Sequence, residues 1–218
     1  MFIGHFGAGL AARQIDKKIS LGLLILASQF IDLLWPILVI AGIEKVKIEP
    51  GNTAFTPLNF VNYPFSHSLL AVIIWGLLFT AVYYFFKKEV RGAIILGALV
   101  LSHWALDLFT HRPDLPLFPW SDFKVGFGLW DSVLFTIIIE GGIFAAGIYL
   151  FLKNAGKRDE KFNVRFWSFI IFLTFIYFVN IYGTPPPSER EVGYAGLALW
   201  VFVLWGFWID KKEKKTNE

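Results

Sequence analysis

Residues 101–111 read LSHWALDLFTH, and this stretch decides how the chain folds. His103, Asp107 and His111 recur at every fourth position. On an α-helix this spacing places the three side chains on one face, one turn apart. The stretch therefore predicts a helix with a stripe of ionisable groups along one side.

The helix that carries this stripe is otherwise apolar. Residues 93–100 are all Ala, Ile, Leu, Gly or Val, and no Lys or Arg lies between Arg91 and Arg112. Ionisable side chains at membrane depth are costly and usually functional. A bound metal ion is one partner that would offset this cost, because imidazole and carboxylate are the usual protein ligands of zinc and similar divalent ions.

The composition is that of an integral membrane protein. Of 218 residues, 56% are hydrophobic and 18% aromatic, and the mean hydropathy is +0.59. Only 17% are charged, against about 25% in a typical soluble domain. The net charge is +3, but the basic residues cluster beside apolar runs, which argues for lipids as partners and against nucleic acid. The chain has no cysteine, which excludes disulfides and thiolate metal sites.

Six apolar runs are predicted as transmembrane helices, for which about 20 residues suffice. They cover residues 20–43, 66–86, 92–110, 129–152, 166–182 and 194–209. We expect an all-α polytopic bundle of about six transmembrane helices, with Ser66 as the N-cap of the second and irregular loops at 44–63 and 111–127. Residues 1–218 form one membrane domain, in which 1–152 carry the site and 153–218 add two spans and a basic tail.

The distribution of basic residues predicts the orientation. Six spans place both chain ends on one side, and most Lys and Arg residues fall on that side. The exceptions are Lys45, Lys47, Arg112, Lys124 and Arg190. By the positive-inside rule both termini are expected in the cytoplasm of a prokaryotic cell, with the spans in its cytoplasmic membrane.

The intramembrane ionisable residues are expected to converge. Counted along their spans at ~1.5 Å per residue, Asp32, His103 and Glu140 lie at similar depth, and Asp107 lies one turn further out. His67 and His111 lie near the outer interface. One outward-opening cavity can therefore hold the set, although each polar residue could instead bond a neighbouring helix. The set comprises Asp32, His67, His103 and Asp107, with Glu140 at its edge.

Four motifs in the same order resemble a known family. They are HFGAG at 5–9, ASQFID at 27–32, SHSLL at 66–70 and LSHWALD at 101–107. Together they are similar to the YdjM-like family of membrane-bound metal-dependent hydrolases, and more distantly to zinc-dependent phospholipase C and related nucleases. The resemblance covers residues 1–120 and implies the metal ligands His5, Asp32, His67, His103 and Asp107. Ser28-Gln29 stand where the family tends to have Pro-Asp, so this chain has one carboxylate fewer.

These observations predict a metal-dependent hydrolase of a phosphoester or lipid head group. Zinc is the first choice of metal and manganese the second; His111 is a further candidate ligand, and Glu140 or Asp107 is the candidate general base. The alternatives are a metal or proton carrier and a purely structural bundle.

The position of His5 is a separate question, because the predicted orientation puts the N-terminus in the cytoplasm. His5 reaches the site only if residues 1–12, which carry no charged side chain, fold back into the bundle as a re-entrant helix. Otherwise this segment lies on the membrane surface.

Overall fold

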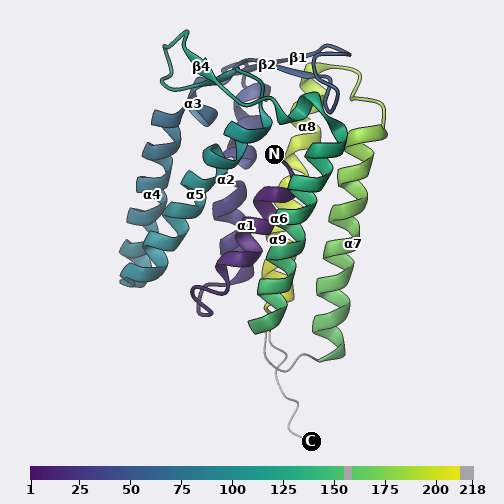
Figure 1. Cartoon of the computed structure of the whole chain (residues 1–218). Coiled ribbons are helices and arrows are strands. Elements are labelled where there is room, and N and C mark those ends of the chain that lie inside the picture. The colour runs from purple at the N-terminus through teal and green to yellow at the C-terminus, as the bar shows by residue number, and fades with distance from the viewer. Residues whose placement is uncertain (155–158, 212–218) are drawn as a thin grey trace, which may run out of the picture.

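Long helices lie side by side in a single bundle (Figure 1). The structure is a computed structural model, and it describes residues 1–154 and 159–211. The helices are α1 (Ile3–Ala12), α2 (Leu21–Ile40), α3 (Pro64–His67), α4 (Leu69–Lys87), α5 (Val90–Thr110), α6 (Val133–Asn154), α7 (Glu160–Tyr182), α8 (Glu189–Leu197) and α9 (Leu199–Ile209), with a 3₁₀ turn at Leu129–Asp131.

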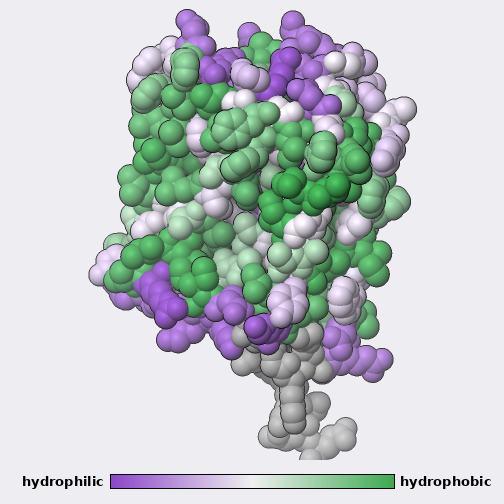
Figure 2. All heavy atoms as spheres, in the orientation of Figure 1, coloured by the Kyte–Doolittle hydropathy of each residue, from purple (hydrophilic) through white to green (hydrophobic). Residues whose placement is uncertain are grey.

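Within the described residues, six helical segments are long and apolar enough to span a membrane. They are α2, α4, α5, α6, α7 and the pair α8–α9, which together run from Glu189 to Ile209. The space-filling view shows a broad apolar belt between two polar ends (Figure 2). The prediction of an all-α polytopic membrane bundle is confirmed.

Helix starts follow local capping chemistry, with one correction. Ser20 caps α2 by accepting a hydrogen bond from the backbone N–H of Leu23, at 3.3 Å. The second predicted span is divided into α3 and α4, because Ser68 is extended, with φ −69° and ψ 143°. Its hydroxyl accepts from the N–H of Ala71 at 3.2 Å. Ser68, not Ser66, is therefore the N-cap of α4, and the prediction for Ser66 was wrong.

Two short antiparallel strand pairs replace parts of the predicted irregular loops. β1 (Lys45–Ile48) pairs with β2 (Leu58–Asn62), and β3 (Leu115–Pro116) pairs with β4 (Lys124–Val125). In β1 the buried Val46 alternates with exposed lysines, as in a strand with one face packed on the core. These strands lie across one end of the bundle (Figure 1), where β1 contacts α8 and β3 contacts α3.

The first helix folds back into the bundle, so of the two positions considered for residues 1–12 the re-entrant one is correct. α1 is almost entirely buried, and Figure 1 shows the N-terminus inside the bundle, between α2 and α6. α1 packs most extensively against α6. The approach is close because Gly7 has no side chain: a Cβ added there would lie 2.7 Å from the carbonyl oxygen of Ile143.

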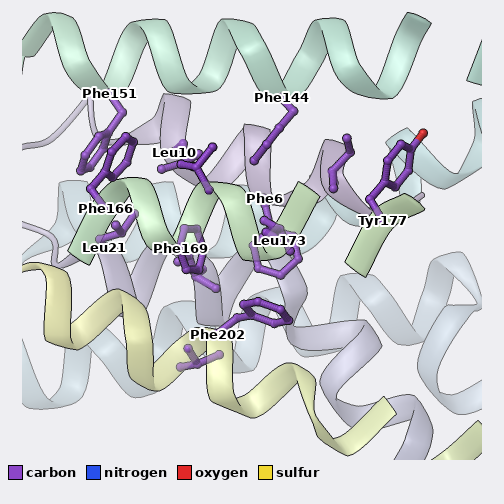
Figure 3. Close-up of a cluster of buried hydrophobic side chains, with 14 of the residues drawn as sticks. Phe6, Leu10, Leu21, Phe144, Phe151, Phe166, Phe169, Leu173, Tyr177 and Phe202 are labelled. Atoms are coloured by element: carbon purple, nitrogen blue, oxygen red, sulfur yellow. The ribbon is translucent and has the colours of Figure 1, made fainter. Parts of the chain in front are cut away.

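An aromatic core holds α1 in place from the other side. Phe6 and Leu10 are completely buried among side chains of α6, α7 and α9 (Figure 3). The ring of Phe6 meets Phe169 and Phe202 edge to face, with centroids 6.1 and 5.4 Å apart. Apolar burial on this scale is the main force that stabilises such a buried segment. The last two spans therefore pack directly on the helix that carries His5.

The charged residues separate into two ends, as predicted. At the end opposite the strands, Arg13 pairs with Asp210 at 3.1 Å, and Arg91 donates to the carbonyl oxygen of Ile15 at 2.6 Å. The other end carries the strands with Lys45, Lys47 and Lys124. Lys157, Arg158, Lys212, Lys214 and Lys215, which also entered the prediction of orientation, lie outside the described residues. Which end of the bundle faces the cytoplasm stays a prediction. Met1 itself lies inside the bundle and not at either end.

Candidate metal centre

Asp107 lies at the centre of a buried cluster of histidines and carboxylates. It projects from the last turns of α5 on the same face as His103, and the two side chains are 1% and 0% exposed. The Nε2 atom of His103 lies 3.2 Å from Oδ2 of Asp107. The predicted four-residue spacing on one helix face is thus what brings these groups together.

Two other elements complete this side of the cluster. Asp32 comes from the middle of α2, and its Oδ1 lies 3.5 Å from Nε2 of His103. His67 ends the one-turn helix α3, and its Nε2 lies 3.4 Å from Oδ1 of Asp32 and 3.8 Å from Oδ2 of Asp107. Separating α3 from α4 therefore has a consequence for the site, because it turns His67 towards α5.

The re-entrant helix supplies the fifth side chain. Nε2 of His5 lies 3.0 Å from Oδ1 of Asp107. The imidazole ring of His5 stacks on that of His103, with centroids 3.6 Å apart and 9° between the planes. The α-amino nitrogen of Met1 also approaches Oδ1 of Asp107, at 2.5 Å. The structure thus brings together all five residues that the family resemblance implied as ligands.

Hydrogen bonds behind His67 and His103 fix the orientation of their rings. The hydroxyl of Ser66 donates to Oε2 of Glu44 at 2.6 Å, so it accepts from Nδ1 of His67, at 2.7 Å. Nδ1 of His103 donates to the carbonyl oxygen of Ser28 at 2.9 Å. With the proton on Nδ1 in each neutral ring, the Nε2 lone pair faces the carboxylates. Such outer hydrogen bonds are typical of histidines that bind metals.

His111 is buried and faces the cluster. It directly follows the last residue of α5, and its side chain is only 3% exposed. Nδ1 of His111 bonds Oδ1 of Asp114 at 2.9 Å, and its Nε2 lies 4.0 Å from Oδ1 of Asp107. The Tyr63 hydroxyl donates to the same Asp114 oxygen at 2.8 Å. Asp114 therefore turns His111 towards the cluster.

The electrostatics at His111 fit this arrangement. Burial outweighs the hydrogen bond to Asp114 and lowers the pKa of His111, which favours the neutral ring. Burial alone would raise the pKa of Asp114, but the bond to His111 and the Tyr63 hydroxyl bring it below the ordinary value. Burial and the neighbouring Asp114 charge raise the pKa of Tyr63 well above the ordinary value, so its hydroxyl stays a donor.

Glu140 supports the cluster from α6. Its Oε2 accepts the backbone N–H of Phe2 at 2.8 Å, so the carboxylate binds the start of α1. Its Oε1 is buried and has no hydrogen-bond partner among the described residues. Glu140 thus lies beside the residues that position His5, and its role as a base stays a prediction.

The donor set fits a divalent ion. Among Asp32, His67, His103 and Asp107, the contacts given above span 3.2–3.8 Å, and donors about 2.0–2.1 Å from a tetrahedral zinc ion are themselves roughly 3.3 Å apart. Nε2 of His103 is buried and makes no hydrogen bond within residues 1–154 and 159–211. Buried polar atoms nearly always have a partner. A metal ion would supply one.

The structure also reveals residues that sequence reasoning missed, namely Glu44, Ser66, Tyr63 and Asp114. Ser66 adjoins His67 and Asp114 follows His111 by three residues, so both carried a local signal. Glu44 carried none, because it lies 22 residues before Ser66 in the chain and meets it only through the β1–β2 hairpin.

Access to the cluster is restricted. The Asp32 side chain is 22% exposed, whereas those of His103 and Asp107 are buried. At the strand end, a recess of about 460 Å³ adjoins His111 through Asp114, and Arg112 and Lys124 add positive charge to it. The recess is lined by Asn59, Phe60, Val61, Arg112, Pro113, Asp114 and Lys124.

Six apolar spans around a buried His/Asp cluster define a polytopic helical membrane protein with a candidate metal centre. The chain belongs to the YdjM inner membrane protein family, whose family model matches residues 3–186 and so covers every residue of the cluster. No curated protein and no solved structure matches the chain. The family resemblance is therefore confirmed, whereas metal binding and hydrolase activity stay predictions.

Proposed function

We propose that this protein is a metal-dependent hydrolase of phosphoesters, acting at the membrane. One observation carries the proposal: Nε2 of His67 and His103 and carboxylate oxygens of Asp32 and Asp107 face a common centre, with both Nδ1 atoms tied back by hydrogen bonds. A zinc or manganese ion held there would lower the pKa of a bound water towards neutrality and polarise a phosphoryl oxygen.

The residues of the chain would have separate tasks. Both oxygens of Asp107 face histidines, which suits a ligand better than a base. Glu140 keeps one buried oxygen without a partner in the described part of the chain, which suits a proton acceptor. Asp32 is the partly exposed member of the cluster.

The recess at the strand end supports an anionic substrate. Arg112 and Lys124 lie at its wall, and Asp114 links that wall to His111. Cationic side chains attract phosphate from a distance and fix its orientation. A phospholipid or another phosphorylated amphiphile fits this position, because its head group would reach the recess from the end of the apolar belt.

The carrier alternative needs a polar path to the opposite end of the bundle. Beyond the buried polar residues Ser28 and Gln29, which precede Asp32 by about one turn of α2, the interior towards the Arg13 end is apolar: Leu10, Leu21 and Ile25 are completely buried. Such a segment blocks ions and protons, which favours the hydrolase over the carrier.

The test is an assay of metal content and hydrolysis on the full chain purified in detergent. We expect stoichiometric metal, metal-dependent hydrolysis of bis(p-nitrophenyl) phosphate or of a phospholipid in mixed micelles, and loss of both in Asp107→Asn. Asp122→Asn is the matched control, because Asp122 is exposed on the loop before β4. Metal-loaded protein that hydrolyses no phosphoester would overturn the proposal.

A further inference from the structure

The two oxygens of Asp107 face different sets of nitrogen atoms. Oδ2 lies 3.2 Å from Nε2 of His103 and 3.8 Å from Nε2 of His67. Oδ1 lies 3.0 Å from Nε2 of His5 and 4.0 Å from Nε2 of His111. A single tetrahedral ion on the Oδ2 side, with Asp32, His67 and His103, would leave His5 and His111 unused.

We propose that the cluster binds two divalent ions bridged by Asp107, an inference that rests on the metal centre of the proposed function. The first ion is held by Asp32, His67, His103 and Oδ2 of Asp107. The second is held by Oδ1 of Asp107 with His5 and His111. The backbone nitrogen of Met1 lies 2.5 Å from that oxygen and would have to move aside for the ion.

At the second position His111 has an outer hydrogen bond like those at the first, whereas Nδ1 of His5 has no partner among the described residues and the ring is held by packing. Nδ1 of His111 is held by Asp114, which directs Nε2 inward. His5 is held by the packing of its ring on His103 and by the anchoring of α1 on Glu140. Outer contacts of this kind fix the ligand geometry before the ion binds.

The charge of the site also favours two ions. Asp32, Asp107 and Glu140 are carboxylates in or beside the cluster, and α5 contributes no Lys or Arg after Arg91. Paired ions about 3.5–4 Å apart are a recurrent arrangement in phosphoester hydrolysis, because they stabilise both the attacking and the leaving oxygen. The missing carboxylate at Ser28-Gln29 is then offset by the shared use of Asp107.

Metal stoichiometry decides the question without any assay of activity. The full chain in detergent is titrated with Mn²⁺. Bound metal per chain is measured by elemental analysis, and the Mn²⁺ electron paramagnetic resonance spectrum is recorded at each step. We expect the wild type to saturate at two ions per chain with a spin-coupled spectrum. His5→Ala should saturate at one ion with an uncoupled six-line spectrum, and Asp122→Asn should behave as the wild type.

His5→Gln provides a second variant of similar volume in case His5→Ala disturbs the fold, and helix content is checked for both. Saturation of the wild type at one ion, or two coupled ions retained in both His5 variants, would overturn the inference. One ion together with phosphoester hydrolysis would leave the proposed function standing. Two coupled ions without hydrolysis would refute the proposed function and leave the two-ion centre.

Discussion

The imidazole of His5 lies flat on the imidazole of His103, with ring centroids 3.6 Å apart. One ring comes from a re-entrant helix of ten residues and the other from a full span. This contact joins the start of the chain to the centre of the cluster, so the metal site and the packing of α1 depend on each other.

We predict that His5→Phe separates these two contributions. Phenylalanine keeps an aromatic ring on His103 but offers no nitrogen, so the stability of the metal-free protein should change by less than about 1.5 kcal/mol. Metal affinity should fall at least tenfold. Thermal unfolding in detergent and a metal titration measure the two effects. If the variant binds metal as tightly as the wild type, His5 is not a ligand.

The hydroxyl of Ser66 should influence metal binding without touching the metal. Ser66→Ala removes the acceptor that fixes the proton of His67 on Nδ1, and loss of such an outer partner typically costs about 10–100-fold in metal affinity. Ser68→Ala is the matched comparison, because Ser68 caps α4. It should lower the free energy of unfolding by about 1 kcal/mol and leave the affinity unchanged. Equal affinities in the two variants would mean that Ser66 serves only the fold.

Asp114 should stabilise the fold in a pH-dependent manner. Its pKa in the folded protein lies below the ordinary value of 3.8, so its contribution is complete above that pH and is lost as pH falls through the folded-state pKa. Asp114→Asn should therefore melt below the wild type at pH 6, and the difference should shrink as pH drops below 3.8. Melting curves between pH 3 and pH 7 test this; a difference that does not change with pH would contradict it.

Lys124 should act on substrate binding. Lys124→Ala removes a positive charge from the wall of the recess, and such a half-buried charge near the surface is worth about 1 kcal/mol, or roughly a fivefold rise in KM for an anionic phosphoester. The value of kcat should change little, because Lys124 does not contact the cluster in the described structure. Lys47→Ala, on β1 at the same end of the bundle, serves as the control. A larger effect on kcat than on KM would argue against this position for the head group.

The orientation is tested by labelling single cysteines introduced into a chain that has none. Asp122→Cys lies at the strand end and Lys17→Cys at the opposite end, and both positions are exposed. In intact cells a membrane-impermeant maleimide should modify position 122, and it should reach position 17 only after permeabilisation. The reverse result would place the strand end in the cytoplasm.

The parts of the site that the sequence predicted are those fixed by helical periodicity. His103 and Asp107 share a face because the helix repeats every 3.6 residues, and the depth of Asp32 followed from counting along an uninterrupted span. The turn of His67 towards α5 was not predictable in this way, since it depends on the extended conformation of Ser68. The hairpin that brings Glu44 to Ser66 was not predictable either, because the polar composition of residues 44–63 is typical of an irregular loop.

The final prediction concerns the close approach of α1 to α6. In Gly7→Ala the added methyl carbon would lie 2.7 Å from the carbonyl oxygen of Ile143, and backbone cannot give way as a flexible side chain can. We expect α1 to be displaced, with a loss of about 1–3 kcal/mol in stability and weaker metal binding through His5. Gly142 lies on α6, and a Cβ added there would meet no atom within 4 Å. Gly142→Ala should therefore be neutral or stabilise the protein by up to about 1 kcal/mol. Thermal unfolding and metal titration of both variants compare the two positions. If Gly7→Ala behaves as Gly142→Ala does, α1 does not lie against α6 as the structure has it.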